Sequence, residues 1–356
     1  MEIENCSDIL ETSNNAANVS ASLSLLLYRF HNHALLILPI LSMVLNGFCL
    51  FIFFDKIWRK STLSILLKYL SATEIAFNFS GFICTITKFI DYPSIGYFSK
   101  LFWVFVLQVG TFSVSTALIC RNWTILHLAA FRFESICRPL SSRKLYTNKY
   151  SPRVLWLTYV LAGIFAFPRT FEYEPSFCKG ELSLNPGLIK YHWYEYGYQG
   201  SLIFIIQTAA PVAITSVLSF GVMKAIFKMK KFRQSCSKKF HKKHNAVSGD
   251  FLMIFICFAF FILEIPSFFS KVLKSYLMKH QKFTEDILLA TMGNLLVYLD
   301  SVINIFVYII SNPTFRERSK NLFQPKRDLK SDSKIGKTAL SKMEIKCDND
   351  FDSNEI

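Results

Sequence analysis

The sequence predicts an all-α fold, a bundle of seven transmembrane helices. The chain has 356 residues, of which 52% are hydrophobic, and seven long apolar stretches run through it. Most of these stretches are close to the roughly 20 residues that a helix needs to cross a bilayer core. Basic residues concentrate in alternate connections between the stretches. A helix satisfies its own backbone hydrogen bonds, as lipid requires, so we expect each stretch to be helical.

The predicted spans are residues 33–54, 66–89, 101–130, 154–167, 200–223, 251–269 and 287–310. The first span contains no Lys, Arg, Asp or Glu. The fourth span is short, and it needs residues 150–152 or 169–171 to cross a bilayer. Residues 1–32 form a predicted extracellular tail, 33–323 the membrane domain, and 324–356 a polar, disordered cytoplasmic tail.

The net charge of +15 is placed unevenly. Lys and Arg gather after the first, third, fifth and seventh spans, which the positive-inside rule makes cytoplasmic. This places the N-terminus outside the cell. We expect a multi-pass protein of the plasma membrane. Its tail carries two glycosylation sequons, at Asn5 and Asn18. The acidic, polar start does not resemble a signal peptide, so the first span is expected to direct its own insertion.

The basic run 224–243 has two interpretations, a solvated loop attracted to anionic membrane lipid or a surface that binds a partner. A nucleic-acid partner is not expected, because the basic residues are divided among membrane loops.

Residues 287–310 contain no Lys for a retinal Schiff base, which argues against an opsin. The sequence shows no internal repeat of the kind that many membrane transporters have. Since no metal-ligand spacing and no hydrolase or kinase motif occurs, we expect no cofactor, no metal and no enzyme.

Short motifs fall in order on successive spans. They are Asn46-Gly47, Leu70-Ser71-Ala72-Thr73-Glu74, Arg132 with Pro139, Pro211, Pro266, Asp300-Ser301-Val302-Ile303-Asn304-Ile305-Phe306-Val307-Tyr308 and Phe315-Arg316. Together they resemble the motifs of rhodopsin-like G-protein-coupled receptors, over about residues 36–323. The resemblance implies that an extracellular ligand activates a heterotrimeric G protein, and that a short amphipathic helix follows the seventh span. It implies that Arg132 contacts the G protein, and that Asn304 and Tyr308 switch the seventh helix.

Within that family, Pro168-Arg169-Thr170-Phe171-Glu172 and Ser135-Ile136-Cys137-Arg138-Pro139-Leu140 are similar to stretches of invertebrate FMRFamide-type neuropeptide receptors. This similarity implies an extracellular peptide ligand. A chemosensory or orphan receptor for a small molecule stays an alternative. A transporter or channel is a further one, which the charged interior would also suit.

The chain departs from the family pattern at informative positions. Phe131 replaces the acid that usually precedes Arg132, and Glu264 replaces the usual Trp of the sixth helix. The third helix lacks the Cys that normally bridges to the second outer loop, where Cys178 lies. We therefore expect Cys178 to be unbridged or joined to one of two other candidates, Cys6 and Cys84.

Four charged residues fall inside predicted spans: Glu74, Arg121, Glu264 and Asp300. The resemblance places Asn46, Glu74, Arg121 and Asp300 around the family's sodium pocket. A guanidinium matches carboxylates well, so Arg121 is predicted to pair with both acids in place of the ion. The alternative is that Arg121 reaches the interface and Glu74 is protonated. Glu264 either touches ligand or is a neutral acid bonded to a backbone carbonyl.

Aromatic residues cluster before the fifth span, in Tyr191-His192-Trp193-Tyr194 and at Tyr196 and Tyr198. One interpretation is an interfacial aromatic belt. The other is that some of them, such as Trp193 and Tyr194, line a peptide entrance, with negative charge from Asp91, Glu172, Glu174 and Glu195. An acidic, aromatic entrance would suit a cationic peptide such as one that ends in Arg-Phe-amide.

Overall fold

The computed structural model describes residues 20–55, 62–87, 97–137, 150–178, 181–236, 248–279, 283–311 and 313–323. The chain divides into two units, Met1–Asn312 and Pro313–Ile356. Asn5, Asn18 and Cys6 lie outside the described residues, as does the predicted tail 324–356. The glycosylation sites and the tail therefore stay predictions.

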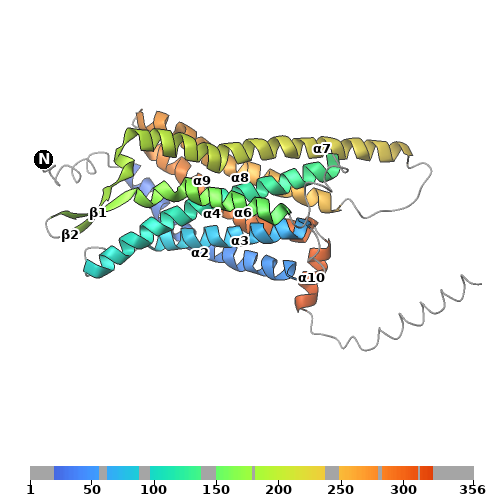
Figure 1. Cartoon of the computed structure of the whole chain (residues 1–356), viewed down its shortest axis with the longest axis horizontal. Coiled ribbons are helices and arrows are strands. Elements are labelled where there is room, and N and C mark those ends of the chain that lie inside the picture. Colours follow the sequence, from blue (N-terminus) through green and yellow to red (C-terminus); the bar gives the residue numbers. More distant parts are fainter. Residues whose placement is uncertain are drawn as a thin grey trace, which may run out of the picture. The chain divides into compact units, whose positions relative to one another are not determined.

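The first unit is a bundle of long helices that lie side by side (Figure 1). The helices are α2 (Ser20–Phe53), α3 (Thr62–Thr87), α4 (Tyr97–Cys137), α6 (Tyr150–Ala166), α7 (Ala210–Cys236), α8 (Ser248–Lys279) and α9 (Phe283–Ser311). Neighbours in space include α8 with α9, α3 with α4, and α2 with α9. The predicted all-α, seven-helix fold is confirmed.

Five helical stretches of the described chain are long and apolar enough to cross a membrane. They are His33–Phe53, Leu101–Cys137, Ser151–Phe171, Trp193–Met229 and Leu288–Ile310. The helix α3 is less apolar because Lys68, Glu74 and Asn78 interrupt it, and α8 carries the predicted span 251–269.

Several helix ends differ from the prediction. The helix α2 begins at Ser20, inside the expected tail, because residues 20–32 contain no Gly or Pro to interrupt it. The short fourth span is completed on both sides, by Tyr150 and by the 3₁₀ helix η2 (Phe167–Phe171), which includes Pro168. The fifth helix begins as two π-helical segments, η4 (Trp193–Ile203) and η5 (Ile205–Ala209), before α7. Such segments are rare and often lie at functional sites.

A β-hairpin that the sequence analysis did not predict follows η2. Strands β1 (Tyr173–Cys178) and β2 (Glu181–Pro186) are antiparallel, with Tyr173 opposite Pro186 and Cys178 opposite Glu181. A short 3₁₀ helix, η3 (Leu188–Lys190), leads from the hairpin to η4. We call this end of the first unit the hairpin end.

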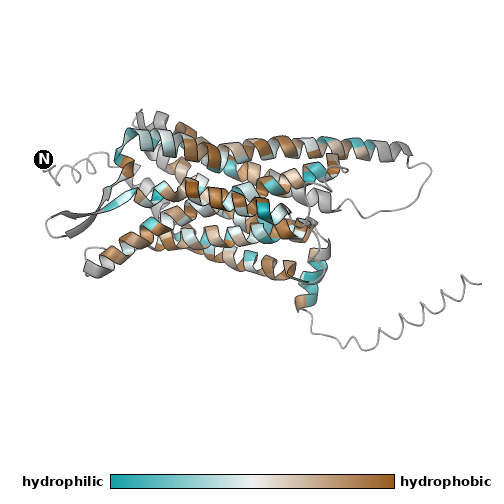
Figure 2. Ribbon diagram, in the orientation of Figure 1, coloured by the Kyte–Doolittle hydropathy of each residue, from teal (hydrophilic) through white to brown (hydrophobic). Residues whose placement is uncertain are grey.

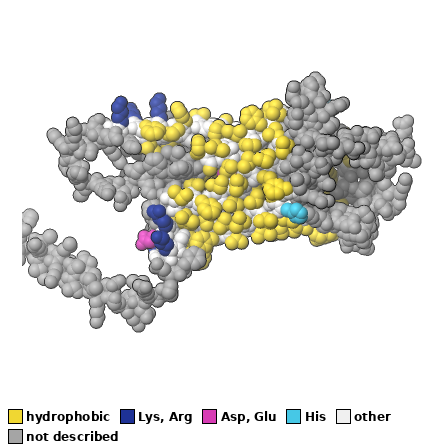
Figure 3. Space-filling view, turned by 180° about the vertical axis from the view of Figure 1, so that it is seen from behind, with side chains coloured by type: hydrophobic (Ala, Val, Ile, Leu, Met, Phe, Trp, Pro, Cys, Tyr) yellow, Lys and Arg dark blue, Asp and Glu magenta, His cyan; other side chains and the backbone are white. Residues whose placement is uncertain are grey.

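The outer surface of the bundle is apolar. Hydrophobic residues dominate the helices, and their side chains cover the middle of the visible face (Figures 2 and 3). Many large apolar side chains of the described helices are exposed, among them Ile37, Val44, Trp156, Val217 and Ile310. A soluble protein rarely exposes apolar patches this extensive. The surface is that of a protein whose solvent is lipid.

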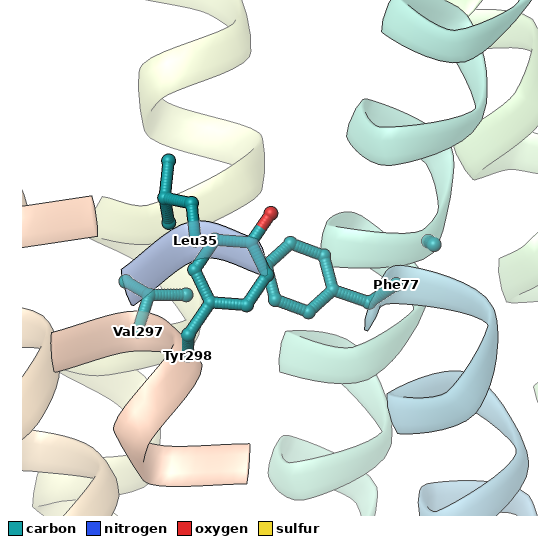
Figure 4. Close-up of a cluster of buried hydrophobic side chains, with 5 residues drawn as sticks. Leu35, Phe77, Val297 and Tyr298 are labelled. Carbon is teal, nitrogen blue, oxygen red and sulfur yellow. The ribbon is translucent and has the colours of Figure 1, made fainter. Parts of the chain in front are cut away.

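One hydrophobic cluster joins four helices. Leu35, Phe77, Ala117, Val297 and Tyr298 are all buried in it. The rings of Phe77 and Tyr298 are stacked, with 4.9 Å between centroids (Figure 4). Gly81 lies against the Tyr298 ring, so closely that a Cβ atom there would overlap the hydroxyl. The lack of a side chain at Gly81 therefore leaves the room that the Tyr298 ring occupies.

The second unit is described only over α10 (Pro313–Phe323). Its sequence alternates apolar residues such as Phe315 and Leu322 with charged residues such as Arg316 and Lys320. The predicted short helix after α9 is therefore present.

Candidate functional site

The centre of the bundle contains a buried arginine that binds three acids. Arg121 of α4 donates from Nε to Oε1 of Glu74 over 3.0 Å and from Nη1 to Oε1 of Glu264 over 2.8 Å. It also donates from Nη2 to Oδ2 of Asp300. None of these four side chains is more than 2% exposed. One guanidinium therefore joins α3, α8 and α9 to α4.

Aromatic rings and an amide complete the surroundings of this guanidinium. The Phe77 and Phe260 ring centroids lie 5.8 and 5.9 Å from its Cζ atom. Nη1 also donates to Oδ1 of Asn122 over 3.2 Å. A cation over aromatic faces is attracted by the ring quadrupole. These contacts hold the charge where water is excluded.

A second layer of polar side chains holds Glu74. Asn304 donates from Nδ2 to its Oε1 over 2.9 Å, and the Ser301 hydroxyl donates to Oε2. Ser301 in turn accepts from Nδ2 of Asn78 over 2.7 Å, and its backbone carbonyl accepts from Nδ2 of Asn46 over 3.0 Å. We call the set Asn46, Glu74, Asn78, Arg121, Glu264, Asp300, Ser301 and Asn304 the polar core.

The polar core brings together four residues that the sequence analysis grouped: Asn46, Glu74, Arg121 and Asp300. It adds Glu264, which accepts a bond from Arg121, an arrangement that the sequence analysis did not consider. It also adds Asn304, which had been assigned only to a switch in the seventh helix. Three carboxylates share one guanidinium, so the cluster needs bound protons or the donors of the second layer to be stable.

A cavity of about 470 Å³ lies at the hairpin end. It is lined by Arg169 of η2, by Glu195, Tyr196, Gln199, Gly200, Ser201, Ile203, Phe204 and Gln207 of the fifth helix, and by Lys271 and Val272 of α8. Its volume is in the range of small-molecule and peptide-end sites. Of the residues predicted for a ligand entrance, Glu195 and Tyr196 line this cavity, whereas Glu172, Glu174, Trp193, Tyr194 and Glu264 do not.

Glu172 and Tyr194 are buried beside the cavity and bond to each other. The Tyr194 hydroxyl donates to Oε1 of Glu172 over 3.0 Å, and Nε2 of Gln199 donates to the same oxygen over 2.6 Å. Nε of Arg169 donates to it over 2.8 Å. Burial, together with the Glu172 charge, raises the pKa of Tyr173 in the adjoining strand. The charge of Glu172 is thus compensated internally, and the expected open acidic entrance is wrong for this residue.

Trp193 and Glu174, by contrast, are exposed at the hairpin end.

Cys84, a candidate disulfide partner of Cys178, lies in α3 with its sulfur against Gly110 of α4. The side chain of Cys178 lies outside the described residues. Its disulfide partner therefore stays a prediction.

Residues 45–308 match the family of seven-transmembrane receptors of the rhodopsin type. The chain belongs to this family. The receptor is 23% identical to the FMRFamide peptide receptor frpr-18 of Caenorhabditis elegans over 306 residues, which are 80% of this chain and 67% of the relative. It is 24% identical to the ultraviolet-sensitive opsin of Melopsittacus undulatus over 250 residues, 67% of this chain and 68% of the relative.

The predicted membership in the rhodopsin-like class is thereby confirmed. The chain is a multi-pass membrane receptor coupled to G proteins, and not an enzyme. The family match ends at Tyr308, which is buried with its ring edge-on to Phe53 at 5.4 Å between centroids.

Arg132 lies near the end of α4 that is remote from the hairpin. It is half-buried, and its Cζ atom is 5.8 Å from the centroid of the Phe131 ring. The roles predicted for Arg132, Asn304 and Tyr308 need a partner protein to be tested, so they enter the proposal below.

Proposed function

We propose that this receptor binds an extracellular peptide of the FMRFamide-like class and activates a heterotrimeric G protein from the plasma membrane. The observation that carries the proposal is the hairpin-end cavity, with Glu195 beside Tyr196 and Phe204. A carboxylate and aromatic faces suit a peptide that has a basic and an aromatic side chain. The similarity to frpr-18 over 80% of the chain supports the same ligand class. In this arrangement the N-terminus is outside the cell.

Helix α8 connects the cavity to the polar core. Lys271 lines the cavity, and Glu264, which binds Arg121, lies seven residues earlier on the same helix. Seven residues are about two helical turns, so both side chains lie on one face. Pro266 lies between them, inside α8, where it removes a backbone hydrogen bond and favours bending. Ligand contacts with α8 therefore act on the Arg121–Glu264 bond.

Activation in this proposal is a shift between two states of the bundle. A ligand favours the state that it binds more tightly, and it shifts the equilibrium only by that difference in affinity. The polar core is the element that has two arrangements, with Glu264 bound to Arg121 or released from it. Asn304, which donates to Glu74, and Tyr308 transmit the change along α9, and Arg132 contacts the G protein.

The proposal is tested by expressing the receptor in cells and recording G-protein signalling while a library of amidated and free-acid peptides is applied. Peptides that end in Arg-Phe-amide should activate the wild type. Arg132→Ala should abolish signalling at equal surface expression, and Lys149→Ala, which changes a basic residue outside the motif, should not. Activation by small molecules alone, with every peptide silent, would refute the peptide assignment.

A further inference from the structure

The two cations that line the hairpin-end cavity differ in how their charge is compensated. Arg169 donates from Nε to Oε1 of Glu172 over 2.8 Å and from Nη2 to Oε2 over 3.4 Å. Its Nη1 donates to the Ser115 hydroxyl. All three nitrogens are therefore used, and a carboxylate balances the charge. Arg169 forms part of the wall of the cavity, and its charge is already paired with Glu172.

Lys271 has no such directly bonded carboxylate. Its Nζ donates to the Thr208 hydroxyl over 3.0 Å, and among the described residues no carboxylate lies within 4.0 Å of it. Over the same part of the chain, Glu195 is not within 4.0 Å of a cation either. Both groups line one cavity and do not pair with each other. Lys271 is exposed and Glu195 is half-buried, so each can keep its charge and still reach a ligand in the cavity that both line.

We propose that Lys271 binds a carboxylate of the ligand, while Glu195 binds a cationic group of the same ligand. This inference rests on the proposed peptide function and narrows the ligand to peptides that carry both charges. The carboxylate has two sources, an acidic side chain or a free C-terminus. Thr208 holds the Lys271 ammonium beside η5, and Phe204 and Val272 supply the apolar wall. A carboxylate on Lys271 couples ligand charge to α8 and hence to Glu264.

The test uses hexapeptides in three arms that share Arg-Phe at the end. The first arm is amidated and has Asp upstream, the second is amidated with Asn in its place, and the third has Asn and a free C-terminal acid. Unrelated hexapeptides with and without an acidic residue form a fourth set. Each is applied to the wild type, Lys271→Met, Lys271→Arg and the control Lys190→Met. Lys190 is an exposed lysine of η3 outside the cavity, with its Nζ 5.2 Å from the centroid of the Tyr191 ring.

In the wild type, at least one carboxylate arm should activate at about 10-fold or more lower concentration than the Asn-amide arm. The first arm identifies a side-chain carboxylate and the third a C-terminal one. Lys271→Met should remove this preference, Lys271→Arg should keep part of it, and Lys190→Met should leave it unchanged. Lys271→Glu should reverse it, favouring a Lys-containing hexapeptide, which gives a positive signal that a misfolded variant cannot.

The outcomes separate this inference from the proposed function. Equal potency of the three arms in the wild type and in Lys271→Met would overturn the carboxylate site and leave the peptide function intact. Activation only by acidic peptides that lack Arg-Phe, dependent on Lys271, would support the site and overturn the FMRFamide-like class. Silence of every peptide on a receptor that reaches the cell surface would overturn both.

Discussion

Replacing Arg121 by Met tests how much the polar core contributes to the bundle. The variant keeps a side chain of similar length and removes the guanidinium that bonds to Glu74, Glu264 and Asp300. Loss of one partner of a buried pair typically destabilises a protein by about 3–5 kcal/mol, because the remaining charge is left uncompensated. That is a large share of the roughly 5–15 kcal/mol by which folded domains are stable. We therefore expect Arg121→Met to lose most of its surface expression.

The hydrogen bonds of the three acids predict which second substitutions restore the stability of Arg121→Met. Glu74 keeps two donors, Asn304 and Ser301, after Arg121 is removed. Among the described residues, Glu264 and Asp300 have hydrogen bonds only to Arg121. Adding Glu264→Gln and Asp300→Asn to Arg121→Met should therefore recover more stability than adding Glu74→Gln does.

The assay is the unfolding temperature of the detergent-purified receptor, read with a thiol-reactive dye. Cys49 and Cys120 are buried, unbridged thiols that become reactive as the bundle opens. Arg169→Met is the matched control, because Arg169 is 21% exposed on its side chain and pairs with one carboxylate. It should lose less stability than Arg121→Met. An Arg121→Met receptor that unfolds at the wild-type temperature and reaches the surface normally would refute this account of the polar core.

Three further predictions concern packing, ions and the N-terminal tail. Gly81→Ala should destabilise the receptor by about 1–3 kcal/mol, because the added Cβ overlaps the Tyr298 hydroxyl. Adding Tyr298→Phe should recover part of this loss, measured by thermal unfolding. Gly47→Ala is the control and should be neutral, because no atom lies within 4 Å of the added Cβ. Agonist affinity should be equal in sodium and in potassium buffer at matched ionic strength, since Arg121 occupies the place that the resemblance assigns to sodium. A drop in agonist affinity that is specific to sodium would show that an ion still enters the polar core. Glycosidase treatment should lower the apparent mass of the receptor, and removing both predicted sequons should abolish that shift.

The sequence predicted the fold because lipid leaves few alternatives. Apolar length and the placement of Lys and Arg were enough to locate the helices to within a few residues at most ends. The hairpin at 173–186 was missed, although Lys179-Gly180 separates its strands and a two-residue connection with Gly is a common hairpin signal. The π-helical start of the fifth helix has no comparable signal, because it depends on packing against neighbouring helices.

The site was predicted in part for a similar reason. Charges inside a span are conspicuous, so Glu74, Arg121 and Asp300 could be singled out from the sequence. That Glu264 also turns toward Arg121 depends on the rotation of α8 against α4, which a sequence does not state. The pairing of Arg169 with Glu172, by contrast, has the i, i+3 spacing of neighbouring residues on a helix and could have been predicted.

The most direct test of the account is nucleotide exchange by a purified heterotrimeric G protein with the receptor reconstituted in lipid nanodiscs. Peptides that end in Arg-Phe-amide should accelerate exchange of GDP for GTP with the wild type, and not with Arg132→Ala. Glu264→Gln should change the basal rate without peptide, because it weakens the bond between α8 and Arg121. Exchange that is the same with and without every peptide, from a receptor shown to be folded by its unfolding transition, would contradict the account.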